Sequence, residues 1–148
     1  KPSSDVFLGL STRFNYKNWD FSVSARANMG NFVYNNVQSG SGVYGGAYHS
    51  TGYLSNRSHD ALFTGFNNWN YFSDYYIEDA SFLRIDNISL GYQLMNIAEN
   101  VNLHLSFTVQ NALVLTKYSG LDPEVFGGID NNLYPRPRVF LVGVNLDF

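Results

Sequence analysis

A long central segment of this 148-residue chain carries the residue types that bind polar ligands. Residues 31–79 hold twelve aromatic residues, seven asparagines and six glycines. Aromatic faces stack on the apolar faces of sugars, and asparagine amides bridge pairs of hydroxyl groups. The candidate contact residues are Tyr44, Tyr48, Tyr53, Trp69, Tyr71, Tyr75 and Tyr76. Packing of these rings against one another is the favoured interpretation, ahead of contact with a partner protein and of contact with a ligand.

Three carboxylates stand close together in the stretch GLDPEVFGGIDNN, at Asp122, Glu124 and Asp130. Carboxylates at such spacing can hold Ca²⁺, but the spacing does not fit an EF-hand loop. An aspartate before a proline more often accepts backbone N–H groups in a turn. We therefore expect a turn at Asp122, and no metal or other cofactor.

The three histidines lack the neighbours that catalysis needs. A catalytic site brings a nucleophile or an activated water within reach of a base and of a group that orients the base. His49 and His59 lie near Asp60 without such spacing, and His104 lies within the expected strand 101–111. A histidine within a polar network is the favoured interpretation of His104, so we do not expect an enzyme.

Five segments alternate apolar and polar side chains with the period of two that is typical of strands. The expected strands are residues 6–16, 19–29, 81–94, 101–111 and 139–148. The connection Lys17-Asn18 predicts a tight hairpin turn. Within the third strand the apolar positions change parity near Asp86 and Asn87, which predicts a β-bulge there.

The connections between these strands alternate in length. Lys17-Asn18 and residues 95–100 are short, whereas residues 31–79 and 116–138 are long. All short turns therefore lie at one end of the sheet and all long loops at the other. Outer-membrane barrels have this asymmetry, with the long loops outside the cell.

Composition and strand length indicate that the apolar face meets lipid. Charged residues make up only 14% of the chain, against a usual share of about 25%. The expected strands match the ~9–11 residues of a tilted membrane-spanning strand. Net charge is −3 and there is no basic run, so we expect no nucleic-acid partner. The aromatic residues at the short-turn end predict a girdle at the lipid headgroups, formed by Tyr16, Trp19, Tyr92 and Phe148.

Five strands cannot close a barrel by themselves. An unpaired strand edge is not tolerated in lipid, and the smallest membrane barrels have about eight strands. We therefore expect an all-β, antiparallel transmembrane β-barrel segment that belongs to a larger barrel. Its last strand alternates apolar residues on one face and ends on an aromatic, with Phe140, Val142, Val144, Leu146 and Phe148.

Three stretches resemble the C-terminal strands of the SusC/RagA-type TonB-dependent transporters of Bacteroidetes outer membranes. They are DASFLRIDNISLGYQL at 79–94, LSFTVQNALVLTKYSGLDPEV at 105–125 and YPRPRVFLVGVNLDF at 134–148. FLRIDNISLGY and TKYSGLDPE are the specific motifs, and the resemblance is weakest over residues 31–79. It implies that residues 1–148 are the C-terminal part of a 22-stranded barrel with a plug. Residues 31–79 and 116–138 would be its last two extracellular loops.

The same resemblance implies a function. Such transporters sit in the outer membrane as multi-pass barrels and import large nutrients, commonly glycans and in some cases peptides. Import is driven by the TonB–ExbB–ExbD complex, through parts of the transporter outside this sequence, and a SusD-like surface lipoprotein forms a hinged lid. For barrels generally, a terminal strand ending in an aromatic such as Phe148 is the signal for the insertion machinery. The alternative is a soluble β-sandwich that binds glycans or mediates adhesion, and a barrel enzyme ranks third.

Overall fold

The structure is a computed structural model that describes residues 1–98, 101–131 and 134–147. The chain divides into two compact units. The sheet unit comprises Asp5–Met29, Ser81–Thr116 and Arg136–Phe148, and the loop unit comprises Lys1–Ser4, Gly30–Ala80 and Lys117–Pro135. Among the described residues, no helix is long and apolar enough to cross a membrane.

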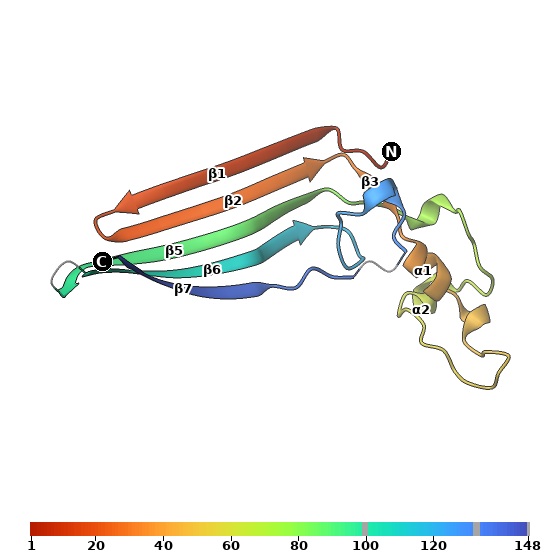
Figure 1. Cartoon of the computed structure of the whole chain (residues 1–148). Helices are drawn as coiled ribbons and strands as arrows, with labels where there is room; N and C mark the ends of the chain where they lie inside the picture. The colour runs from red at the N-terminus through yellow and green to blue at the C-terminus, as the bar shows by residue number, and fades with distance from the viewer. Residues whose placement is uncertain (99–100, 132–133, 148) are drawn as a thin grey trace. The chain divides into compact units, whose positions relative to one another are not determined.

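The sheet unit is one antiparallel sheet of five strands in the order β1-β2-β5-β6-β7 (Figure 1). The strands are β1 (Val6–Tyr16), β2 (Trp19–Met29), β5 (Phe82–Ala98), β6 (Val101–Thr116) and β7 (Val139–Asp147). All five expected strands are confirmed. Strand β6 runs further than expected, because its ladder with β5 continues through the pairs Ile85–Leu113 and Leu83–Leu115. Strand β5 also continues into the expected connection 95–100, where Ala98 pairs with Val101.

The turn between β1 and β2 is as tight as predicted. Tyr16 pairs with Trp19, so Lys17 and Asn18 alone make the connection. Lys17 has a φ of 53°, in the left-handed region. Two-residue hairpin loops use positive φ values because the resulting backbone twist matches that of the flanking strands.

The predicted bulge is confirmed, and it is part of a stepwise shift across three strands. Ala25 and Val23 of β2 pair with Ile85 and Ile88 of β5, which in turn pair with Leu113 and Val109 of β6. Between these rungs β2 has Ser24, β5 has Asp86 and Asn87, and β6 has Gln110, Asn111 and Ala112. Each strand thus has one residue more than the strand before it. The step keeps the apolar side chains of all three strands on one face despite the change of parity in β5.

The apolar face of the sheet is largely exposed. Val142 is 77% exposed, and Leu10, Phe14 and Phe140 are also more than half exposed. Of the hydrophobic residues that are buried in the described part of the chain, two belong to the sheet unit, Ala27 and Phe82. The sheet therefore presents its apolar side chains outward instead of packing them into a core.

The loop unit contains short regular elements that the sequence did not predict. They are β3 (Phe32–Tyr34), α1 (Asn36–Ser41), η1 (Tyr44–Gly46), α2 (Ala61–Thr64), η2 (Asp74–Tyr76), β4 (Ile77–Asp79) and η3 (Phe126–Gly128). Strands β3 and β4 pair with each other, and Val33, Ala80 and Tyr118 form a small core with Val125 against it. Three-residue strands are too short to show a periodicity, so the sequence predicted irregular loops in this unit.

Candidate functional site

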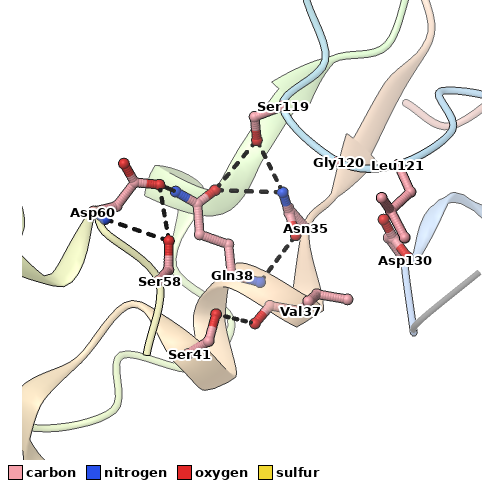
Figure 2. Close-up of a pocket in the computed structure, with 10 residues that line it drawn as sticks. All are labelled: Asn35, Val37, Gln38, Ser41, Ser58, Asp60, Ser119, Gly120, Leu121 and Asp130. Atoms are coloured by element: carbon pink, nitrogen blue, oxygen red, sulfur yellow. Dashed lines mark hydrogen bonds between the residues drawn. The ribbon is translucent and has the colours of Figure 1, made fainter. Parts of the chain in front are cut away.

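The loop unit contains a pocket of about 230 Å³ that both long loops line (Figure 2). Segment 31–79 contributes Asn35, Val37, Gln38, Ser41, Ser58 and Asp60. Segment 116–138 contributes Ser119, Gly120, Leu121 and Asp130. The pocket therefore exists only where the two loops meet.

Asn35 is the centre of the polar network beside this pocket. Its Oδ1 accepts a hydrogen bond from the Gln38 backbone N–H at 2.9 Å, which caps the N-terminus of α1. Its Nδ2 donates to Glu78 Oε1 at 2.9 Å and to Ser119 Oγ at 3.1 Å. The Ser119 backbone N–H also donates to Glu78 Oε2, at 2.8 Å. The Glu78 carboxylate thus accepts hydrogen bonds from both long loops.

Gln38 extends the network to a third segment of the loop unit. Its Oε1 lies 3.3 Å from Asn35 Nδ2, and its Nε2 donates to Asp60 Oδ2 (Figure 2). The Ser58 hydroxyl donates to the same Asp60 oxygen at 3.3 Å. The amide of Gln38 therefore connects Asp60 to the residues around Glu78.

Tyr118 and Asp130 form a buried pair at the base of the 116–138 loop. Their side chains are 5% and 2% exposed, and the Tyr118 hydroxyl donates to Asp130 Oδ2 at 2.7 Å. Burial raises the pKa of Tyr118, and the hydrogen bond to Asp130 and the charges of Asp130 and Glu78 raise it further. At Gly120, a Cβ would come within 2.4 Å of the Tyr118 ring. The TKYSGLDPE motif is therefore built around this ring and its hydroxyl.

The carboxylates considered for Ca²⁺ are engaged with the protein. Asp122 Oδ1 accepts the Glu124 backbone N–H at 2.9 Å, which confirms the expected turn. Asp130 bonds Tyr118. Within the described ranges, no three His, Cys, Asp or Glu side chains are grouped so that they could hold a metal ion. The expectation that no cofactor binds stays a prediction.

The aromatic candidates of segment 31–79 lie outside this pocket. Tyr76 is 1% exposed, with ring contacts to Tyr34 and Tyr75, and burial followed by the proximity of these two tyrosines raises its pKa. Trp69 and Tyr71 stack with an interplanar angle of 7°. Six candidates are exposed: Tyr44, Tyr48, Tyr53, Trp69, Tyr71 and Tyr75. Ring packing thus accounts for Tyr76, and contact of the exposed rings with a ligand or a lid stays a prediction.

His104 lies in a polar network on the other face of the sheet. Its Nε2 is 2.8 Å from Asp20 Oδ1, across the intervening strand β5. A Cβ at Gly91 would lie 2.1 Å from Asp20 Oδ1, so the glycine leaves the room that this pair occupies. The hollow around the pair is lined by Arg13 and Gln93 among others, and the described lining residues include no serine, threonine or cysteine. The network interpretation of His104 therefore accounts for its surroundings without a catalytic role.

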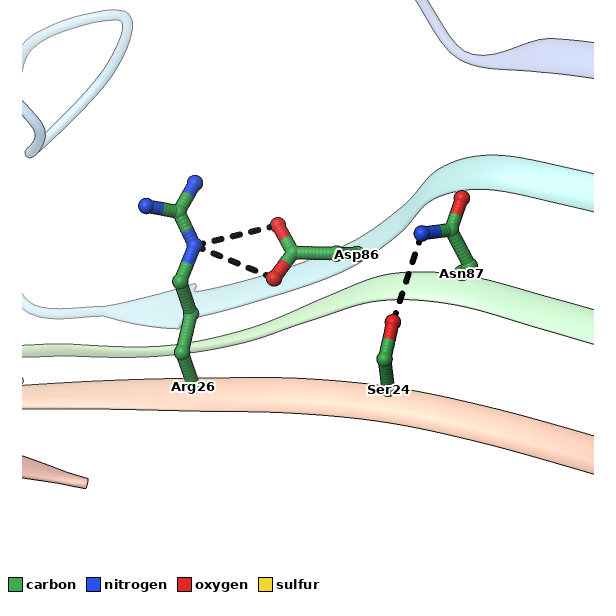
Figure 3. Close-up of polar contacts among 4 residues, drawn as sticks. All are labelled: Ser24, Arg26, Asp86 and Asn87. Atoms are coloured by element: carbon green, nitrogen blue, oxygen red, sulfur yellow. Dashed lines mark hydrogen bonds and ion pairs between the residues drawn. The ribbon is translucent and has the colours of Figure 1, made fainter. Parts of the chain in front are cut away.

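The β-bulge places the carboxylate of Asp86 on this polar face (Figure 3). Arg26 stands directly opposite Arg84 in the ladder, which brings two like charges together. Asp86, the extra residue of β5, accepts from Arg26 Nε at 3.0 and 3.1 Å. Beside it, Asn87 Nδ2 donates to Ser24 Oγ at 3.3 Å. The FLRIDNISLGY motif thus supplies both the bulge with its ion pair and, through Gly91, the space for Asp20 and His104.

Most residues of the expected aromatic girdle and of the terminal strand lie on the sheet. The rings of Trp19 and Tyr92 lie 4.5 Å apart on paired positions, and Tyr16 pairs with Trp19. Phe148 lies outside the described residues. On β7 the side chains of Phe140, Val142, Val144 and Leu146 are exposed. A position at the lipid headgroups and a role in membrane insertion stay predictions.

Comparison with known proteins places the chain in a family. No family model matches it. The whole chain aligns at 44% identity with the TonB-dependent receptor SusC of Bacteroides thetaiotaomicron. This chain is a segment of a SusC/RagA-type TonB-dependent receptor. It is also 28% identical, over 99% of its length, to the TonB-dependent receptor P3 of Formosa agariphila.

Solved structures of this family share the fold of the SusC/RagA-type segment. The structure of the RagAB peptide transporter matches 99% of the chain with a TM-score of 0.78 at 24% identity. The RagAB peptide importer in its closed-closed state matches the same share with a TM-score of 0.79 at 23% identity. The sheet therefore has the fold of a segment of these transporter barrels. The chain spans 16% of SusC and 17% of receptor P3 and of each RagAB chain.

The comparisons decide between the alternatives raised by the sequence. The relatives are receptors and transporters, not enzymes. A soluble β-sandwich needs a second large sheet, whereas the described residues form one five-stranded sheet and the short β3–β4 pair. Sequence reasoning missed Asn35, Gln38 and Ser119. An asparagine followed three residues later by a glutamine is a capping signature, so the first two could have been found.

Proposed function

We propose that this chain is part of an active importer in the outer membrane that takes up large nutrients, either glycans or peptides. The observation that carries the proposal is the 44% identity to SusC over the whole chain. In this role the segment supplies one part of the barrel wall and two of the outer loops. Energy comes from TonB–ExbB–ExbD through parts of the receptor outside this sequence.

The two faces of the sheet support this role. The exposed aliphatic and aromatic side chains of β1 and β7 suit lipid, which accepts no charged groups without a large free-energy cost. The opposite face carries Arg26, Asp86 and the Asp20–His104 pair, which suit a wet interior. A polar interior would admit polar cargo and would also contact a plug.

The loop unit is the part that would meet a SusD-like lipoprotein lid. It is compact and carries exposed rings, including Phe72 and Phe126, which are 93% and 101% exposed. Exposed aromatic residues are enriched where proteins bind partners. The RagAB structures are of a peptide importer, which supports a transport role for receptors with this fold.

Uptake by the full-length receptor tests the proposal. The receptor gene is deleted in the source bacterium and restored, and uptake of labelled oligosaccharides and oligopeptides is followed with and without a proton uncoupler. We expect uptake of one class to need both the receptor and the proton gradient, and a lipoprotein to co-purify with the receptor in detergent. Uptake that persists without the receptor, or that ignores the uncoupler, would contradict the proposal.

A further inference from the structure

The charged side chains that line the pocket between the two long loops are all acidic. Among the described residues, the charged side chains that line it are Asp60 and Asp130, and no lysine, arginine or histidine does so. Asp130 is 2% exposed, and Asp60 is partly buried. A charge in such surroundings is screened less by solvent than a surface charge.

The hydrogen-bond donors on the lining are largely used within the protein. Asn35 Nδ2 has two hydrogens and three acceptors within reach, on Gln38, Glu78 and Ser119. The Ser119 hydroxyl donates a hydrogen bond to Glu78 Oε1 at 2.8 Å.

The remaining hydroxyls follow the same pattern. Ser58 donates to Asp60 at 3.3 Å, and Ser41 donates to the Val37 carbonyl at 2.8 Å. The lining hydroxyls therefore have few hydrogens left to offer a ligand.

Acceptor capacity remains on the same lining. Asp60 Oδ2 accepts from Gln38 and Ser58, whereas Asp60 Oδ1 accepts no hydrogen bond from the described part of the chain. In Figure 2 these two oxygens are distinct, and only one of them belongs to the network. A ligand that donates hydrogen bonds and accepts none matches this arrangement.

We infer that this pocket binds one basic side chain, the ammonium group of a lysine or the guanidinium group of an arginine. Lysine and arginine carry three and five N–H donors and no acceptor. The volume of about 230 Å³ is below the roughly 300–1,000 Å³ of drug-sized ligand sites, so it suits one side chain better than a longer ligand. Val37 and Leu121 offer apolar surface for the methylene stem. A sugar fits less well, because no aromatic ring of the described part of the chain lines the pocket and sugar hydroxyls also need donors.

The inference does not depend on the proposed import function. The basic group can arrive on a free peptide or on the lipoprotein partner, and the chemistry of recognition is the same. Binding to the purified receptor needs no transport, so failure of one proposal is distinguishable from failure of the other.

The test is ligand-observed NMR on the full-length receptor in detergent, with Nα-acetyl-lysine methylamide as the probe. The uncharged Nα-acetyl-norleucine methylamide has the same aliphatic stem and serves as the matched ligand. We expect the lysine probe to bind and the norleucine probe not to bind. Asp60→Asn keeps acceptors for Gln38 and Ser58 but removes the charge, and we expect it to weaken binding about tenfold. Repeating the titration with the lipoprotein bound separates the sources, because a partner's basic side chain would exclude the probe and a free peptide site would stay open.

Two variants guard the result. Asp122→Asn removes one carboxylate from the same unit, outside the pocket lining, and its side-chain oxygen still accepts the Glu124 N–H, so binding should stay unchanged. Leu121→Trp enlarges a pocket-lining side chain that is 71% exposed, and it should block the probe without disturbing a core. Equal binding of both probes, no binding of the lysine probe, or unchanged affinity in both Asp60→Asn and Leu121→Trp would overturn the inference.

Discussion

The two units of this chain treat apolar side chains in opposite ways. In the loop unit, Val33, Val43, Tyr76 and Tyr118 are buried, as in a small soluble domain. In the sheet unit, the apolar residues of β1 and β7 point outward, and Val142 is 77% exposed. One chain therefore carries two packing patterns, one with a small buried core and the other with an exposed apolar face.

The polar side chains follow the same division. The loop unit places a hydrogen-bonded network around Glu78, and the sheet spreads its polar groups over one face in pairs such as Arg26 with Asp86. Burial of a polar group costs free energy unless it is hydrogen-bonded. The loops thus depend on a few specific bonds, whereas the sheet depends on its surroundings and on its ladder.

The largest expected effect separates the two surroundings. Val142→Arg should lower the free energy of unfolding of the full-length receptor in lipid vesicles by about 2–4 kcal/mol, because it places a charge in the hydrocarbon layer. Leu54→Arg, at a loop residue that is 79% exposed, should change it by less than about 0.5 kcal/mol. Urea titration of both variants measures the difference. Equal costs would show that the two units do not face different solvents.

The next effect tests the core of the loop unit. Tyr118→Phe removes the hydroxyl that donates to buried Asp130, and it should destabilise this unit by about 1–3 kcal/mol. Faster amide hydrogen exchange in residues 117–131 of the full-length receptor would measure it. Tyr134→Phe, at a side chain that is 90% exposed, is the control. Unchanged exchange in Tyr118→Phe would mean that the buried pair does not hold the loop.

The same hydroxyl gives the stability of the loop unit a pH dependence. The pKa of Tyr118 is raised above its usual 10.0, so the folded unit favours the protonated hydroxyl. Its contribution is fully present below about pH 10 and is lost as the pH rises toward the raised pKa. Hydrogen exchange between pH 9 and 11, corrected for the intrinsic rate, should show accelerated opening in the wild type. A parallel acceleration in Tyr118→Phe would assign the effect to another group.

A somewhat smaller effect concerns the link between the two loops. Asn35→Asp keeps the cap of α1 but removes the N–H groups that reach Glu78 and Ser119, and it brings two carboxylates together. We expect a loss of about 1–2 kcal/mol, seen as faster exchange in both 31–79 and 117–131. Asn68→Asp, at an exposed residue of the same loop, should have no effect. Faster exchange in only one loop would contradict the link between the two loops through Asn35.

The smallest effect lies on the polar face of the sheet. Gly91→Ala places a methyl group where Asp20 now lies, and it should break the contact with His104. That pair is partly exposed, so we expect a loss of only about 1 kcal/mol in receptor stability. Gly9→Ala in β1 meets no atom within 4 Å and should be neutral. A larger loss in Gly9→Ala than in Gly91→Ala would contradict this account of the glycine.

The sheet could be predicted from the sequence because each strand repeats its pattern over many residues. Even the bulge at Asp86 was visible, as a change of parity. The stepwise shift was not, because it depends on how three strands align with one another. The ends of β5 and β6 were set by pairing partners, which the sequence does not display.

The loop unit resisted prediction because its contacts join distant residues. Asn35 and Ser119 are 84 positions apart, and neither shows its partner in its own neighbourhood. The motif around Tyr118 was recognisable as a pattern, but the reason for it appears only when Asp130 and Glu78 are placed beside it. The aromatic residues were predicted as contact residues because they are numerous, whereas the pocket is lined mainly by small polar side chains.

The Glu78 carboxylate, with one oxygen on Asn35 and the other on the Ser119 backbone, has a mechanical consequence. A pull on either loop is carried through these bonds to the other, and it reaches the paired strands β3 and β4 on the way. The Glu78 carboxylate therefore couples the two loops mechanically.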